Sequence, residues 1–226
     1  MKKTVLLTVS LLSTIWAFAQ NSKIVTEVVI YKFAESNNFQ FDTLLLDFRN
    51  KVSRLKGYKN YITLQDKNNT NVYIDILQWG NISNAISASN TVKNEETFKP
   101  FTTSIDSLIA YGEFYSFKSF TNNKLKIKMT NKVSEVVVYQ LKADKVSVYS
   151  NIADTTNNFL KTQKGFISRK IMQDNKDSTI FIDIVEWETV EDAQSAMQAS
   201  QQEKSLIPFF EATEKVITFS HYTFYK

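Results

Sequence analysis

The chain has 226 residues, no cysteine and one histidine, and its formal net charge is +4. The lack of cysteine excludes disulfide bonds, cysteine-ligated metal sites and a lipid anchor attached through cysteine. Because the lysines are spread along the chain rather than gathered in blocks, we expect no nucleic-acid partner.

Residues 1–19 are predicted to be a signal peptide. Lys2 and Lys3 precede an apolar stretch over residues 5–18, and Ala17-Phe18-Ala19 is the small-residue pattern typical of a cleavage site. The apolar stretch is too short to span a bilayer. We therefore expect a periplasmic or secreted protein without a stable membrane anchor after cleavage; a retained anchor is the alternative.

The rest of the chain contains one unit twice. Residues 26–31 return at 134–139, and residues 71–79 return at 179–187. The spacing between matched positions is constant at 108 residues (135 − 27 and 187 − 79), with no insertion or deletion. Two similar units in one chain usually pack together as a covalent pseudo-dimer. Further matched pairs are Gly57/Gly165, Ala85/Ala193 and Pro100/Pro208.

Each unit shows the same order of sequence periodicities. In the first, a strand over 25–33 precedes an amphipathic helix over 41–55 that ends at Gly57. Two strands then flank a polar turn at 66–70, and the second strand ends at Trp79. A helix from residue 82, a break at Pro100 and a closing strand over 111–120 complete the unit.

The second unit repeats this order, with an opening strand at 133–141 and a closing strand at 219–226. The order is β-α-β-β-α-β, the ferredoxin-like unit. The predicted fold class is α+β, with a first repeat over 20–120, a linker or edge segment over 121–132 and a second repeat over 133–226. Helices on one side of each sheet leave its other face apolar and exposed. We therefore expect the two units to pack sheet to sheet.

On these elements the sequence resembles the dimeric α+β barrel superfamily, which includes antibiotic biosynthesis monooxygenase-like and stress-responsive barrel proteins. The resemblance is carried by the two opening strands, by the strand ends at 74–79 and 182–187 with their alanine-bearing helices, and by the segments around Pro100 and Pro208. It implies an intrachain version of a barrel that single-unit relatives make from two chains. We therefore expect a monomer with a pseudo-dimeric fold.

The resemblance also implies what to expect of cofactors. Haem-degrading members carry a helix histidine in the regions that match 85–94 and 193–204, and neither region contains histidine here. The only histidine, His221, is on a predicted strand, and its match in the first unit is Glu113. No glycine-rich phosphate loop or histidine metal spacing occurs. We therefore expect no cofactor and no metal.

Four polar or aromatic positions are kept in both units and are the candidate ligand-binding residues. Alternation places Asp75 on the same strand face as Trp79, and Glu27 on the same face as Tyr31. The pairs are Glu27/Glu135, Tyr31/Tyr139, Asp75/Asp183 and Trp79/Trp187. The alternatives are structural: a salt bridge at a sheet edge for the glutamates, a bond to a neighbouring strand for the aspartates, and hydrophobic lids for the tryptophans.

Three functions fit this sequence. The first is an exported protein that binds a small apolar or aromatic molecule in a cavity between sheet and helices. The second is a cofactor-independent monooxygenase, which the resemblance implies. The third is a barrel with a filled core that serves as an interaction module.

Overall fold

The computed structural model describes residues 23–122 and 132–225. The predicted signal peptide and most of the predicted linker lie outside these residues. None of the described helices is long and apolar enough to cross a membrane.

Two lobes follow each other along the chain, and we call residues 23–122 the N-lobe and residues 132–225 the C-lobe. The N-lobe consists of β1 (Val25–Phe33), α2 (Phe41–Val52), β2 (Tyr58–Asp66), β3 (Val72–Trp79), α3 (Ile82–Asn94), α4 (Lys99–Thr102) and β4 (Ile105–Thr121). The C-lobe consists of β5 (Val133–Leu141), α5 (Tyr149–Leu160), β6 (Phe166–Asp174), β7 (Ile180–Trp187), α6 (Val190–Ser200), α7 (Ile207–Ala212) and β8 (Thr213–Phe224). Short 3-10 turns precede α2, α4, α5 and α7.

The matched glycines explain how each first helix turns into the next strand. Gly57 and Gly165 have φ angles of 84° and 73°, in the left-handed region that side chains disfavour. A Cβ atom on Gly57 would also lie 2.0 Å from the Asn84 amide. These positions therefore require glycine for both the backbone angle and the close approach of a helix.

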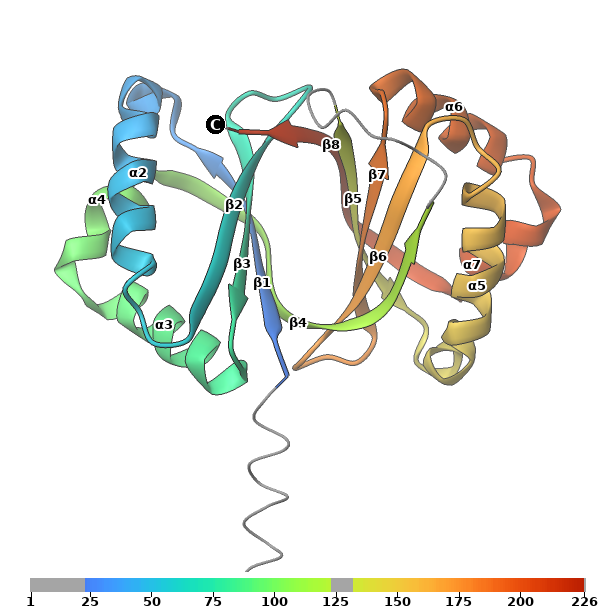
Figure 1. Cartoon of the computed structure of the whole chain (residues 1–226), viewed down its shortest axis with the longest axis horizontal. Helices are drawn as coiled ribbons and strands as arrows, with labels where there is room; N and C mark the ends of the chain where they lie inside the picture. The colour runs from blue at the N-terminus through green and yellow to red at the C-terminus, as the bar shows by residue number, and fades with distance from the viewer. Residues whose placement is uncertain (1–22, 123–131, 226) are drawn as a thin grey trace, which may run out of the picture.

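The eight strands form one closed antiparallel barrel in the order β1-β3-β2-β8-β5-β7-β6-β4. Each lobe contributes a four-stranded sheet, and Figure 1 shows that the helices of each lobe lie on the outer side of its own sheet. The seam between β4 and β6 pairs seven positions, and the seam between β2 and β8 pairs three. The predicted fold, two ferredoxin-like units packed sheet to sheet, is confirmed.

Both closing strands begin earlier than predicted, at Ile105 and Thr213 rather than at residues 111 and 219. Register shifts against β1 and β5 let these early residues continue the pairing. The periodicity of the sequence is interrupted at such shifts, so it misses the start of the strand.

Alternation along the strands separates two environments. Val28 and Ile30 of β1 point into the barrel, where they pack with Ile74, Val136 and Ile182 in one apolar cluster. Tyr31 belongs to a different cluster, between the sheet and the helices. The barrel interior is therefore core, and the candidate residues face the helical side.

Candidate functional site

Each lobe contains a cavity between the outer face of its sheet and its helices. The N-cavity has a volume of about 360 Å³ and the C-cavity about 300 Å³. Glu27, Tyr31, Asp75 and Trp79 line the N-cavity, and Glu135, Tyr139, Asp183 and Trp187 line the C-cavity. The structure thus brings together all eight candidate residues in two sets of four.

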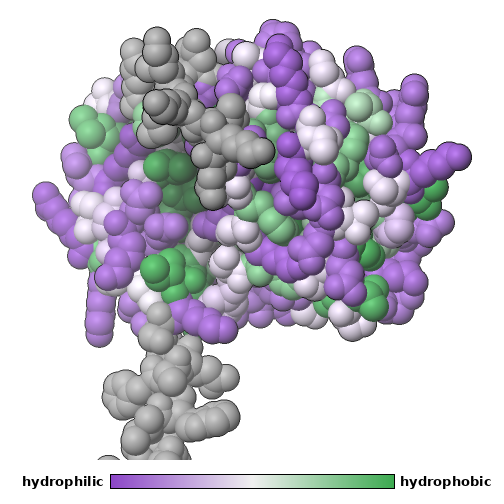
Figure 2. All heavy atoms as spheres, turned by 45° about the vertical axis from the view of Figure 1, so that its right-hand side comes forward, coloured by the Kyte–Doolittle hydropathy of each residue, from purple (hydrophilic) through white to green (hydrophobic). Residues whose placement is uncertain are grey.

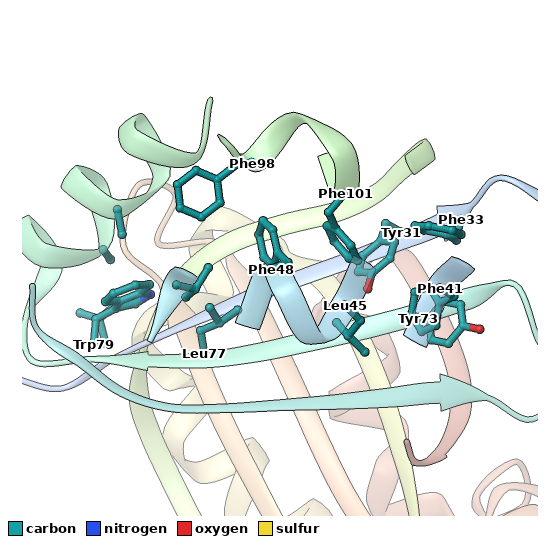
Figure 3. Packing of buried hydrophobic residues seen from close by; sticks show 14 residues of the cluster. Tyr31, Phe33, Phe41, Leu45, Phe48, Tyr73, Leu77, Trp79, Phe98 and Phe101 are labelled. Carbon is teal, nitrogen blue, oxygen red and sulfur yellow. The ribbon is translucent and has the colours of Figure 1, made fainter. Parts of the chain in front are cut away.

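Aromatic side chains form much of the N-cavity wall. Figure 3 shows Trp79 and Leu77 projecting from β3 into the space beneath the helices, with Tyr31 projecting from the neighbouring strand. Phe48 of α2 and Phe101 of α4 stack with ring centroids 4.4 Å apart on the helical side. Such a wall favours a flat apolar molecule, because stacked or edge-on rings gain contact area at little conformational cost.

Glu27 is the most unusual group in this wall. It is 7% exposed, and its Oε2 accepts a hydrogen bond of 2.6 Å from Trp79 Nε1. Burial raises the pKa of Glu27 to about 7; the Trp79 bond opposes this rise, and the nearby Glu113 and Asp75 carboxylates add to it. No cation of the described chain forms an ion pair with it. The edge salt bridge considered from the sequence is wrong for Glu27, because β1 lies between β3 and β4.

Asp75 is held by the neighbouring strand. Its Oδ2 accepts a hydrogen bond of 2.6 Å from the Tyr61 hydroxyl, and its Oδ1 accepts one of 2.5 Å from the Thr63 hydroxyl. Burial raises the pKa of Asp75 to about 6 despite these bonds. Asp75 therefore both lines the cavity and holds β2 against β3.

A third carboxylate, Glu113, lies beneath the N-cavity rim. It accepts a hydrogen bond of 2.7 Å from the hydroxyl of Tyr111, which lines the cavity. Lys176, from the β6–β7 turn of the other lobe, lies 2.9 Å from its other oxygen. Glu113 thus has a cation beside it, whereas Glu27 has the Trp79 indole and the Tyr111 hydroxyl near it and no paired cation among the described residues.

The carboxylates of the C-cavity have different partners from those of the N-cavity. Asp183 forms a buried ion pair with Arg169, whose Nε and Nη2 lie 2.8 and 2.5 Å from Oδ2. The Tyr139 hydroxyl donates to Oδ1 at 2.9 Å and also contacts the Tyr149 hydroxyl. Arg169 was not among the residues expected from the sequence to line a site. The available signal was that the matched position in the first unit is Tyr61, which is neutral.

The second difference concerns His221. Its Nε2 lies 3.3 Å from Glu135, and its ring packs edge-on against Phe219 with centroids 5.3 Å apart. This contact is not a hydrogen bond, and the buried His221 Nε2 and Trp187 Nε1 both have no hydrogen-bond partner among the described residues. In the N-lobe the same tryptophan nitrogen donates to Glu27.

The position of His221 shows whether the chain could bind a haem group through an axial histidine. The His221 imidazole is buried against Glu135 and lines neither cavity. The described residues include no group of three or more His, Asp or Glu side chains arranged to hold a metal ion. The residues present do not fit such a haem.

No protein-family model matches the chain, and no curated protein matches it. Solved structures do. An anthrone oxidase-like protein aligns with a TM-score of 0.72 at 10% identity, covering 90% of this chain and 92% of that one. The protein has the dimeric α+β barrel fold.

This barrel is also similar to a protein assigned as a monooxygenase from Fusobacterium nucleatum, with a TM-score of 0.60, 12% identity and coverage of 91% and 94%. It is similar as well to chlorite dismutase from Candidatus Nitrospira defluvii, with a TM-score of 0.62, 11% identity and coverage of 94% and 95%. At such low identity these likenesses establish the fold, which is known to host unrelated functions.

Proposed function

We propose that the N-cavity binds a small, flat and largely apolar molecule that carries a hydroxyl group, and that Glu27 accepts the hydrogen bond of that hydroxyl. The observation that carries this proposal is a buried carboxylate, with a pKa of about 7 and no paired cation, in the wall of an aromatic cavity. A pocket of this size with few polar groups suits a small organic ligand.

The hydrogen-bonding capacity of the wall supports this ligand class. Both oxygens of Asp75 already accept hydrogen bonds, whereas Glu27 accepts one from Trp79 and retains further acceptor capacity. A ligand that donates to Glu27 would relieve the cost of burying it. A ligand without a donor would leave that cost in place.

A second candidate function is cofactor-independent oxygenation, which the pKa of Glu27 favours. A general base works best when its pKa is close to the working pH. For an anthrone-like substrate, Glu27 would remove one proton from the CH2 group, and dioxygen would oxidise the carbanion to a peroxide anion that takes this proton back. Loss of the remaining C–H proton and cleavage of the O–O bond would then leave a carbonyl and release water. The anthrone oxidase-like structural neighbour supports testing this class.

The proposal also includes the cellular location of the protein. The N-terminal sequence pattern favours export to the periplasm or beyond the cell. There the protein would act as a soluble carrier or enzyme for such a molecule.

The binding experiment compares 1-naphthol with 1-methoxynaphthalene, which has the same rings but no donor. Residues 20–226 carrying Trp187→Phe retain Trp79 as the only tryptophan, so its fluorescence reports on the N-cavity. We expect 1-naphthol to bind at least about tenfold more tightly than the ether. Glu27→Gln should reduce this preference, whereas Glu35→Gln, a change at an exposed glutamate, should preserve it. Equal affinity for the two compounds would overturn the proposal.

The oxygenation experiment measures dioxygen consumption with anthrone. Uptake by the wild type that Glu27→Gln abolishes would support the enzyme. Binding without uptake across anthrone- and quinol-like substrates would leave a binding protein only.

A further inference from the structure

The mouths of the two cavities differ in polarity at matched positions. Helices α6 and α7 and strand β8 place apolar side chains around the C-cavity where α3, α4 and β4 place polar ones around the N-cavity. The matched pairs are Ser89/Met197, Thr102/Phe210 and Tyr111/Phe219. Three lining pairs are instead more polar in the C-cavity: Phe48/Thr156, Tyr61/Arg169 and Val92/Ser200. The pair Leu108/Val216 is apolar in both lobes.

These apolar side chains are exposed to solvent. Met197 is 38% exposed, Phe219 42% and Phe210 50%, and Val216 beside them is 56% exposed. We call these four residues the C-rim. Figure 2 shows that hydrophobic side chains form separate patches on a surface that is otherwise mostly hydrophilic. A cluster of large apolar side chains around the opening of a cavity is unusual for a free surface and is typical of a binding site.

Both acids that line the C-cavity lie next to a nitrogen-bearing side chain, and for Asp183 this is a permanent cation. Asp183 is paired with Arg169, and Glu135 lies against His221. A ligand with a charged or strongly donating group would have to compete with these contacts. The C-cavity and the C-rim together form one largely apolar surface that is partly recessed and partly open.

We propose that the C-cavity is a second binding site, which takes an uncharged, mainly aliphatic chain, part of it inside the cavity and part across the C-rim. The occupant is a soluble apolar ligand rather than a membrane surface, because a flat bilayer would cover the rim and leave a cavity of about 300 Å³ unfilled. This proposal does not depend on the function proposed for the N-cavity.

The test uses N-phenyl-1-naphthylamine, an uncharged probe that fluoresces in apolar sites, and its displacement by 1-dodecanol. The protein is residues 20–226. We expect saturable binding that Met197→Ser/Phe210→Thr, which installs the N-lobe residues, weakens at least about tenfold. Phe210→Thr alone should weaken it less. Both changes are at exposed positions, so thermal unfolding should remain close to that of the wild type.

The matched control is Leu46→Ser, which removes an exposed apolar side chain from α2 of the other lobe. It should leave the affinity unchanged. Absence of saturable binding, or equal affinity in the double variant and the wild type, would overturn the proposal; the second result would show that the probe binds away from the C-rim. Sedimentation with phosphatidylcholine vesicles that requires the C-rim, without binding of 1-dodecanol, would also overturn it in favour of a membrane surface.

Discussion

The two cavities are built on equivalent strands, yet their buried carboxylates have different partners. In the N-lobe, Asp75 is held by the neutral hydroxyls of Tyr61 and Thr63. In the C-lobe, the matched Asp183 is paired with Arg169 at the position that corresponds to Tyr61. Burial raises the pKa of Asp75 to about 6 beside its neutral donors, whereas Asp183 lies against the permanently charged guanidinium of Arg169.

The same contrast applies to the glutamates. Position 113 carries an acid and position 221 a histidine, so Glu27 turns to its tryptophan and Glu135 turns to its histidine. The two shared glutamates thus have different neighbours at one matched position of the adjacent closing strand. A duplicated fold can in this way keep its core while its two cavities acquire different chemistry.

The largest expected effect comes from breaking the ion pair of the C-lobe. Arg169→Met leaves Asp183 buried without a cation and should lower the free energy of unfolding by about 3–5 kcal/mol. Arg169→Tyr, which installs the N-lobe residue, should recover part of this loss. Urea denaturation at pH 7.5 measures both.

The matched change in the N-lobe, Tyr61→Phe, removes one hydrogen bond and should cost about 1–3 kcal/mol. If Arg169→Met cost no more than Tyr61→Phe, the contrast between the two aspartates would be wrong.

The second effect is a pH dependence of the free energy of unfolding, which arises from the N-lobe. The pKa of Glu27 is raised from 4.5 to about 7 in the folded state, so the folded state binds a proton more tightly than the unfolded chain. Stability should therefore fall as the pH rises through this window, by roughly 3 kcal/mol at about 1.4 kcal/mol per pKa unit. Asp75 should add a decline in the same direction between pH 3.8 and about 6.

Glu27→Gln keeps an acceptor for Trp79 and removes the titrating group, so it should flatten the decline above pH 5. Urea denaturation at several pH values measures the slope, with Glu35→Gln as the exposed control. An unchanged slope in Glu27→Gln would show that the titration lies elsewhere.

The smallest effect separates the two tryptophans. Trp79→Phe loses a hydrogen bond to a carboxylate, whereas Trp187→Phe loses a nitrogen that has no partner among the described residues. With similar losses of ring area, Trp79→Phe should cost about 1–2 kcal/mol more at pH 8. Equal costs in thermal or urea unfolding would contradict the different bonding of the two indoles.

The sequence was sufficient for the fold because the repeat, the turn glycines and the strand periodicity all indicate the same architecture. It also placed Asp75 with Trp79, and Glu27 with Tyr31, on shared strand faces, but it did not decide which face of the sheet lines a cavity. It did not reveal Arg169 as a partner of Asp183, because residues 14 positions apart meet only through the register of β6 and β7. For the same reason, the effect of His221 on Glu135 depends on pairing between strands that are distant in sequence.

The unequal seams of the barrel have a consequence for its motion. Seven paired positions join β4 to β6, but three join β2 to β8. Local opening follows the weakest set of contacts, so amide hydrogen exchange should be faster where Leu64–Asp66 meet β8 than along the seam between β4 and β6. Transient opening of the barrel would then be a rotation of one lobe about the longer seam, between β4 and β6. Solvent would reach the barrel interior only from the side of the shorter seam.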